Sequence, residues 1–449
     1  MANTRRRRRR PRRPLGPQEQ APAKAHLDPK LETIEELCSF ERRLAGTDSE
    51  RRAANAMAAR IRATGRRTEI EPIYVHPQAP LVWAFHCLLA FAASIISISV
   101  PVAGFALLLV ATTSFYFDLN TRRHFLRLLF FRRASQNVVS RGENPNAAVK
   151  LVLAAHLDAA RTGTIFGKGF SGLTRRVAGF LPFPHTRILF WSAAILLPML
   201  GARMAGVDTE GLAILQIVPT LILLVSTFLL VDWRLSEVVP GANDNASGVA
   251  VTLSVAEQLE AEAPRNLDVW VVLTGGEECG MEGMRSFTRT HKDELDPFKT
   301  IVLAIDSVGV GDVRWTVGEG MTVSFDMDVR VTQLSEAIAE ADREGSNRYR
   351  AAPLRHGYAT DALAARVGGL RASAITCLEP GAITPANFHT PRDVPGAIDP
   401  QALERAEGFT LDLIRALDRD LARARPKQPA EEPPAPSRPP RSRWRSRNR

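Results

Sequence analysis

Residues 72–117 are a run of 46 residues that contains no Asp, Glu, Lys or Arg. As a single helix this run would be about 69 Å long, more than twice the ~30 Å thickness of a bilayer's hydrocarbon core. It therefore predicts two membrane spans, at about 81–98 and 101–117, joined by a turn near Pro101. The alternative is a pair of buried core helices in a soluble protein.

A second apolar region predicts another hairpin. Residues 211–231 are 21 uncharged residues and make a complete span, whereas 188–202 is shorter. The shorter segment reaches spanning length if Arg187 and Arg203 extend their charged ends to the membrane surfaces. The expectation is four transmembrane helices in two hairpins, with buried core helices again the alternative.

The flanking charges predict an orientation. The turn at 97–103 has no charge, and the turn at 203–210 has one arginine against two acidic residues. The opposite ends of the spans are rich in basic residues: Arg122, Arg123, Arg127, Arg132, Arg133, Lys168, Arg175, Arg176, Arg187 and Arg234. Because positive charge marks the cytoplasmic side, we expect a multi-pass protein of the cell membrane whose two termini and remaining chain are cytoplasmic.

Charge and composition restrict the rest of the chain. Of the net charge of +10, residues 1–13 carry +8 and residues 438–449 carry +6, which leaves −4 on residues 14–437. The body therefore does not suggest a nucleic-acid partner. The Arg- and Pro-rich ends, 1–28 and 425–449, read as disordered tails that either keep the chain soluble or contact the anionic lipid of a bilayer. Four cysteines without a CxxC pair favour a reducing compartment.

Outside the hairpins the chain reads as an α/β domain. Helices are expected at 31–64, 246–262, 281–292 and 400–422, and strands at 68–75, 135–141, 149–155, 267–274 and 300–305. Runs such as VWVVL are continuously apolar, as in a sheet covered on both faces. The expected domain comprises 29–79, 134–165 and 237–424, interrupted by hairpin one at 80–118, a basic juxtamembrane segment at 119–133, and a basic segment with hairpin two at 166–236.

Five short segments place acidic and histidine residues at strand ends, where α/β folds build their sites. They are HLD at 156–158, GANDNASG at 241–248, GGEECG at 275–280, AIDSVG at 304–309 and FHTPRD at 388–393. Together they offer two histidines and several carboxylates. Two divalent metals ~3.5–4 Å apart need such a set, with one bridging carboxylate, and a further carboxylate to move the proton of the attacking water.

These motifs, in this order, resemble the co-catalytic two-zinc aminopeptidases of peptidase family M28, related to bacterial leucyl aminopeptidase. The resemblance covers residues 31–64, 135–160 and 240–420, with both hairpins as insertions. It implies a three-layer α/β/α zinc-peptidase fold with a mixed central sheet. It also implies two Zn²⁺ ions and a peptide or protein N-terminus as substrate.

The resemblance also implies a role for each site residue. His156, Asp244 and Asp306 would hold one metal. Asp244, Glu278 and His389 would hold the other, with Asp244 bridging. Two catalytic residues complete the set: Glu277 as general base and Asp158 as the carboxylate that orients His156.

The chain departs from the family pattern beside these residues. Phe388 precedes His389 where several relatives have a tyrosine that hydrogen-bonds the oxyanion, so the metals alone or a donor such as Tyr358 would have to serve. Asp361 lacks the histidine that usually follows it and receives no metal role. Cys279 has no base arrangement of its own and reads as a packed small residue.

The sequence thus predicts a membrane-anchored zinc exopeptidase, of aminopeptidase type. The alternatives are a glutaminyl cyclase-like acyltransferase, and a non-catalytic scaffold or receptor-like protein on the same fold. The strands at 68–75, 135–141 and 149–155 are expected to form an antiparallel meander. Both hairpins would then leave the sheet edge that carries the metals, so the site would face the bilayer and a membrane-associated peptide.

Overall fold

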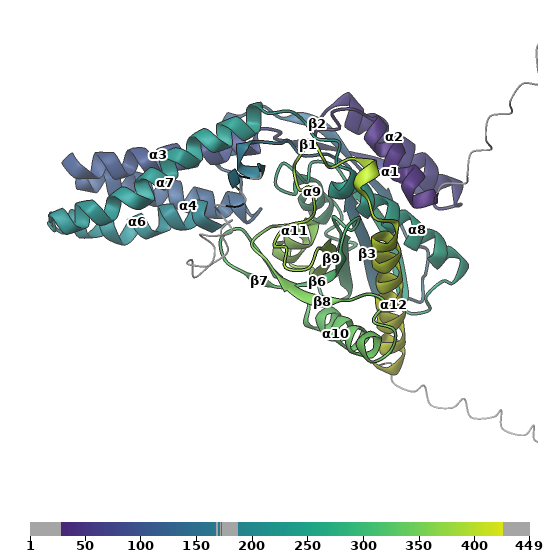
Figure 1. Ribbon diagram of the computed structural model, residues 1–449. Coiled ribbons are helices and arrows are strands. Elements are labelled where there is room, and N and C mark those ends of the chain that lie inside the picture. Colours follow the sequence, from purple (N-terminus) through teal and green to yellow (C-terminus); the bar gives the residue numbers. More distant parts are fainter. Residues whose placement is uncertain (1–27, 168, 171, 173–186, 425–449) are drawn as a thin grey trace, which may run out of the picture.

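A computed structural model describes residues 28–167, 169, 170, 172 and 187–424. An α/β domain forms one part of the molecule, and a bundle of helices projects from one end of it (Figure 1). Apart from Asp28, the expected disordered tails at 1–28 and 425–449 lie outside the described residues, and so does most of the basic segment 168–187.

The described residues of the domain form a mixed sheet with the strand order β1-β2-β4-β3-β5-β9-β6-β7, and β8 also pairs with β6. The strands are β1 (Thr68–Val75), β2 (Arg133–Ser140), β3 (Val149–His156), β4 (Leu267–Thr274), β5 (Thr300–Ile305), β6 (Asp312–Glu319), β7 (Phe325–Asp326), β8 (Ala352–Arg355) and β9 (Arg371–Leu378). The centre, β4-β3-β5-β9, is parallel, and β2 and β6 lie antiparallel on either side of it.

Helices cover both faces of this sheet, which gives the expected three layers. Successive residues of β3 pack into different cores: Leu151 and Leu153 into one, Val152 and Ala154 into the other. This explains why the central strands are apolar without alternation. The first core is closed mainly by α1 (Pro29–Ser39), α2 (Asp48–Ala63), α8 (Gly248–Ala261) and α12 (Pro400–Ala424), with α10 (Val329–Glu344) beside α12. The second is closed by α9 (Glu282–Thr290) and α11 (Asp361–Val367).

The expected meander of the first three strands is wrong in its pairing. β1 pairs with β2, but β4 lies between β2 and β3. The strand β3 is buried along almost its whole length, and it gains parallel partners on both sides in the middle of the sheet. The directions of the strands are nevertheless those of the prediction, because β2 runs antiparallel to β1 and to the parallel pair β3-β4. The carboxyl ends of β1, β3 and β4 therefore share one edge.

The single helix expected at 31–64 is also wrong, because the chain turns between Ser39 and Asp48. A new helix begins there: the hydroxyl of Thr47 accepts the backbone N–H of Glu50, and Glu50 reaches back to the N–H of Gly46. Such reciprocal capping marks a helix start. In the turn, Arg43 is almost fully buried and donates to backbone carbonyl groups that include those of Leu157 and Gly241. Outside the hairpins, the remaining helices and strands expected from the sequence lie within two residues of their predicted bounds.

The bundle consists of α3 (Ala79–Ser99), α4 (Pro101–Leu119), α6 (Ile188–Met204) and α7 (Glu210–Leu235). Three of them, α3, α4 and α7, are long and apolar enough to cross a membrane. The fourth expected span is not of that length: α6 has 17 residues and is about 26 Å long. The described structure thus has three candidate spans and one shorter apolar helix, where four spans were predicted.

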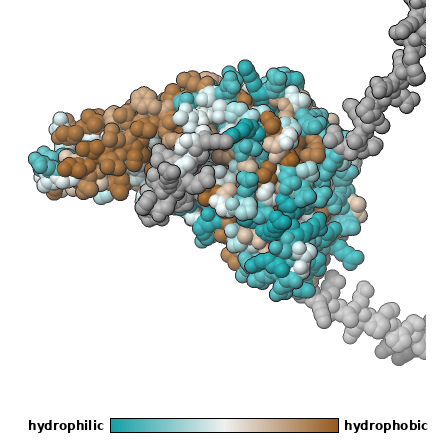
Figure 2. Space-filling view, in the orientation of Figure 1, coloured by the Kyte–Doolittle hydropathy of each residue, from teal (hydrophilic) through white to brown (hydrophobic). Residues whose placement is uncertain are grey.

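The outer surface of the bundle is strongly apolar, in contrast to the domain (Figure 2). Val110, Ile214, Val218 and Phe228 are each more than 60% exposed. Polar groups instead face inward, where the hydroxyl groups of Ser94 and Thr220 bond to each other at 2.6 Å. An apolar exterior with hydrogen bonds between inward polar side chains is typical of helix bundles in lipid.

Candidate active site

The five motifs found in the sequence converge at the edge formed by the carboxyl ends of the parallel strands. His156 ends β3, Glu277 and Glu278 follow β4, and Asp306 follows β5. Asp244 comes from the irregular turn η4 (Ala242–Ser247) that opens α8. His389 joins them from the loop after β9, so all five expected metal ligands and the expected base lie together.

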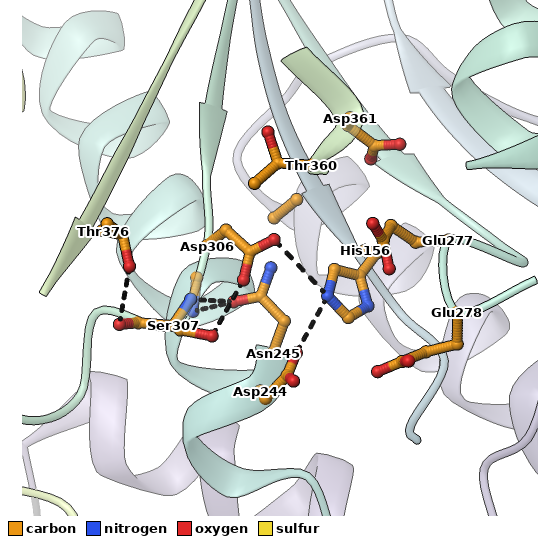
Figure 3. Close-up of polar contacts among 12 residues, drawn as sticks. His156, Asp244, Asn245, Glu277, Glu278, Asp306, Ser307, Thr360, Asp361 and Thr376 are labelled. Carbon is orange, nitrogen blue, oxygen red and sulfur yellow. Dashed lines mark hydrogen bonds and ion pairs between the residues drawn. The ribbon is translucent and has the colours of Figure 1, made fainter. Parts of the chain in front are cut away.

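Asp244 stands between the two histidines. Its Oδ1 lies 3.1 Å from Nε2 of His156, and its Oδ2 lies 3.3 Å from Nε2 of His389 (Figure 3 shows the His156 side). Burial opposes ionisation of Asp244, but the hydrogen bonds with both histidines hold its pKa below the ordinary value. A carboxylate with one oxygen on each histidine can bridge two cations.

The outer ligand candidates sit on opposite sides of this carboxylate. Asp306 Oδ2 lies 3.8 Å from His156 Nε2, and Glu278 Oε2 lies 3.4 Å from His389 Nε2. Burial raises the pKa of Asp306 to about 6 and that of Glu278 well above its ordinary value. Each histidine therefore has two carboxylate partners. One is Asp244, which both histidines share, and the other is Asp306 for His156 and Glu278 for His389.

Glu277 lies next to Glu278 in the chain, but among the described residues it forms no ion pair with either histidine. Its side chain points toward the His156 ring (Figure 3), and burial raises its pKa well above the ordinary value. A buried carboxyl group with a raised pKa, beside a candidate metal centre, has the properties of a proton carrier.

Asp158 holds the loop that carries both glutamates. Its carboxylate accepts the backbone N–H of Glu277 at 3.0 Å through Oδ1 and that of Glu278 at 3.1 Å through Oδ2. The nearest Asp158 atom to Nδ1 of His156 is the main-chain oxygen at 3.1 Å, whereas the carboxylate is 3.7 Å away. The family resemblance implied only the contact of Asp158 with His156 and did not indicate the hydrogen bonds to the loop.

Two further acidic residues that the sequence reasoning missed hold the site's loops in the same way. Asp393 accepts the backbone N–H groups of Asn243 at 2.6 Å and Asp244 at 3.1 Å, and burial raises its pKa to about 7. Glu50 accepts the N–H of Gly276 at 3.2 Å and the hydroxyl of Ser135. Asp393 ends the FHTPRD motif, and Glu50 ends a TDSE capping pattern, so each had a weak signal in the sequence.

The residues that departed from the family pattern also lie at the site. Phe388 stacks on His389 with ring centroids 3.9 Å apart, and Tyr358 lies against Phe388 at 5.4 Å. Asp361 is buried and bonds the hydroxyl of Thr274 at the end of β4. Cys279 is a buried free thiol whose pKa burial raises well above its ordinary value, as expected of a packed residue.

The second insertion supplies part of the wall of the site. Phe166, in the turn η2 (Thr164–Phe166), lies 4.6 Å from the His389 ring, and Trp233, near the end of α7, lies 5.8 Å from it. The site is therefore at the end of the domain from which the bundle projects, as the strand directions require.

The donor set fits a divalent metal. His156, Asp244 and Glu278 each offer a ligand atom, and these atoms lie within 4.8 Å of one another. Glu278 Oε1 and His389 Nδ1 are buried without a hydrogen-bond partner among the described residues. No Lys or Arg of the described residues forms an ion pair with the carboxylates of this centre, so bound cations are the natural counter-charge.

A second group of possible metal ligands, formed by His76, His124 and Glu282, does not fit a cation. The guanidinium of Arg127 lies 3.1 Å from Glu282 Oε1, and that of Arg285 lies 3.0 Å from His124 Nδ1. Two fixed positive charges therefore occupy the space where a cation would bind.

Comparison with known proteins agrees with this site. Residues 228–414 match the sequence model of peptidase family M28. The matched segment is less than half of the chain, and it is similar to this peptidase family. The match includes Asp244, the glutamate pair, Asp306 and His389, and the single sheet joins it to β1, β2 and β3. No curated protein matches the sequence.

Solved structures with a similar chain course include three kinds of protein. A Zn-dependent exopeptidase from Parabacteroides distasonis is 12% identical, with a TM-score of 0.47 over 86% of this chain and 96% of that one. A glutaminyl cyclase from Bacteroides thetaiotaomicron is 13% identical, with a TM-score of 0.48 over 86% and 96%. An aminopeptidase from an Aneurinibacillus species is 13% identical, with a TM-score of 0.49 over 87% and 92%.

Proposed function

We propose that this chain is a peptidase of family M28, namely a membrane-anchored, zinc-dependent exopeptidase that removes residues from the N-terminus of a peptide or protein. The observation that carries the proposal is the Asp244 carboxylate, which presents one oxygen to His156 and the other to His389. A non-catalytic scaffold would not need this complete and closely spaced set.

Two zinc ions are the proposed cofactors. Asp244 would bridge them, with His156 and Asp306 on one ion and Glu278 and His389 on the other. Bound there, the ions would supply Lewis acidity and lower the pKa of the attacking water. The unpaired atoms Glu278 Oε1 and His389 Nδ1 support this assignment, because each leaves capacity for further contacts at the centre.

Glu277 is the proposed general base. It would take the proton of the attacking water and pass it to the leaving amine, so that one C–N bond breaks and one C–O bond forms. Asp158 would hold the backbone of Glu277 and Glu278 in place through its two hydrogen bonds with their N–H groups. This support adds to the role that the family resemblance implies for Asp158, which is orientation of His156.

A zinc measurement together with a substrate panel tests the chemistry. Elemental analysis of the purified protein should give about two zinc atoms per chain. The protein should hydrolyse aminoacyl chromogenic substrates and lose this activity with a chelator. A single zinc with cyclisation of N-terminal glutamine would instead identify a glutaminyl cyclase-like enzyme, and a zinc-free protein would identify a scaffold.

Membrane anchoring by the bundle is also proposed. It is supported by the lengths of α3, α4 and α7 and by the apolar outer surface of the bundle. The basic residues on the domain side support a cytoplasmic catalytic domain. Because Phe166 and Trp233 of the second insertion border the site, the substrate we propose is a peptide at the membrane surface.

Cysteine labelling tests the proposed topology. A membrane-impermeant reagent should label a cysteine introduced at the bundle tip, at Ser99 or Asp208, in intact cells. It should not label one at the exposed domain positions Glu257 or Asp293. Labelling of the domain positions from outside would reverse the orientation.

A further inference from the structure

A buried arginine joins the first inserted hairpin to the loop of the proposed base. Arg127 lies in the short helix η1 (Leu126–Leu129), which follows α4, and its side chain is fully buried. It forms two parallel hydrogen bonds with Asp118, near the end of α4, each 2.9 Å long. The indole N–H of Trp83 in α3 donates to the same carboxylate at 2.9 Å.

The other side of the guanidinium holds the loop 275–282. Its Nη1 donates to the backbone oxygen of Cys279 and lies 3.1 Å from Glu282 Oε1. Gly280 permits this approach: a Cβ there would lie 2.7 Å from Arg127 Nη2, and its φ is +90°. Burial opposes the charge of Arg127, but Asp118 and Glu282 more than offset it and raise its pKa above the ordinary value.

This loop is short and closed on itself. The backbone oxygen of Glu277 accepts the N–H groups of Gly280 and Met281, both at 2.7 Å, and Gly276 accepts that of Glu282 at 3.1 Å. A group that fixes Cys279 and Glu282 therefore also fixes the peptide that carries Glu277. Asp158 holds this peptide from the domain side, and Arg127 holds it from the side of the hairpin.

We propose that Arg127 is a positioning residue for Glu277, through which the first membrane hairpin sets the geometry of the active site. This inference rests on the proposed function, because it concerns the loop of the proposed base. Stability alone does not explain the network, since a buried ion pair is often no more stabilising than apolar residues of similar size. Arginine is suited to the position because its planar fork binds Asp118 and the loop at the same time.

The test substitutes Arg127 without removing its charge. Arg127→Lys keeps a cation but cannot make the paired bonds to Asp118 while also reaching Cys279. We expect kcat to fall ~10- to 100-fold, since a displacement of 1 Å can cost that much, with KM within about twofold and zinc content unchanged. Amide hydrogen exchange of the peptide 275–284 should become faster.

A matched control is Arg203→Lys at the distal end of the bundle. Arg203 is also a buried arginine, and its hydrogen-bond partners among the described residues, Gln216 at 2.8 Å and Asp208 at 2.6 Å, both belong to the second hairpin. It should leave kcat and exchange in 275–284 unchanged. An equal loss of kcat in both variants, or an Arg127→Lys protein with wild-type kcat, would overturn the inference.

Asp118→Asn decides the matter if Arg127→Lys does not fold. The substitution is isosteric and frees the arginine from the hairpin, and it should lower kcat and speed exchange in 275–284 in the same direction. Wild-type values of both quantities would overturn the inference. If the wild-type protein shows no zinc-dependent hydrolysis, the proposed function fails. The comparison of amide hydrogen exchange in 275–284 still shows whether Arg127 holds the loop.

Discussion

Removal of the charge of Asp158 should loosen the loop of the two glutamates. In Asp158→Asn one amide oxygen can still accept an N–H, from Glu277 or Glu278, but the amide nitrogen then faces the other N–H. The variant loses one hydrogen bond to a charged acceptor, worth about 1.5–3 kcal/mol, and leaves a buried donor unpaired. Because Asp158 is fully buried, we expect a loss of about 3 kcal/mol in the free energy of unfolding.

The functional loss should be larger than a stability effect alone would give. Displacement of Glu278 should weaken zinc binding ~10- to 100-fold, which is the usual effect of removing a carboxylate that supports a metal ligand. The assay is a zinc titration followed by kcat at saturating zinc, together with a thermal melt of the zinc-free protein in detergent.

A natural control is Asp342→Asn. Asp342 also accepts two backbone N–H groups, those of Arg348 and Tyr349, each at 2.8 Å, but it lies in the last turn of α10 and far along the chain from the metal motifs. It is half-buried, so a smaller loss of stability is expected, with zinc affinity unchanged. Asp158→Asn with wild-type zinc affinity and a melting temperature no lower than that of Asp342→Asn would refute the reasoning.

Two further predictions concern residues away from the metals. Hydrogen bonds to Glu71 and Glu294 raise the pKa of His291, so this contribution to stability is present below the unfolded pKa of about 6.5 and is lost as the pH rises through the folded value. His291→Gln should therefore cost about 1 kcal/mol in thermal melts at pH 5.5 and less at pH 9, and an equal cost at both would contradict the ion pairs. Burial raises the pKa of Cys38 to about 11, so only ~0.03% of this thiol is thiolate at pH 7.5. The thiols of the native protein should therefore react slowly with iodoacetamide. A thiol assay of the unfolded chain should count four free thiols. Rapid native labelling, or fewer than four thiols after unfolding, would contradict this assignment.

Local patterns were sufficient to predict most of the elements. The strand at 68–75 and the strand at 267–274 have the predicted bounds. For 267–274 the reason is that the apolar run ends at a change of composition. The helices of the bundle could be predicted for the same reason, since long uncharged runs have few alternatives. Most candidate site residues could be found because they end or follow strands, and parallel strands bring their carboxyl ends together. Asp244 differs, because it lies in the turn that opens α8.

Features that depend on partners distant in sequence could not be predicted. The position of β4 between β2 and β3 depends on which strands have both faces covered. The sequence of 149–155 does not specify which strands pair with it. The two-helix division of 31–64 depends on Arg43, whose partners include backbone carbonyl groups more than 100 residues away. The proposed roles of Asp158 and Arg127 are of this kind too, because both residues bond to backbone groups of the 275–282 loop.

The most direct test of the account compares Glu277→Gln with Glu278→Gln. Glu277→Gln should retain both zinc ions and lose activity by ~10²–10⁴-fold, as expected for a general base. Glu278→Gln should bind less zinc, because its carboxylate is the one beside His389. Zinc loss in Glu277→Gln with full zinc in Glu278→Gln would contradict the assignment of these two carboxylates, and full activity in both would contradict the proposed chemistry.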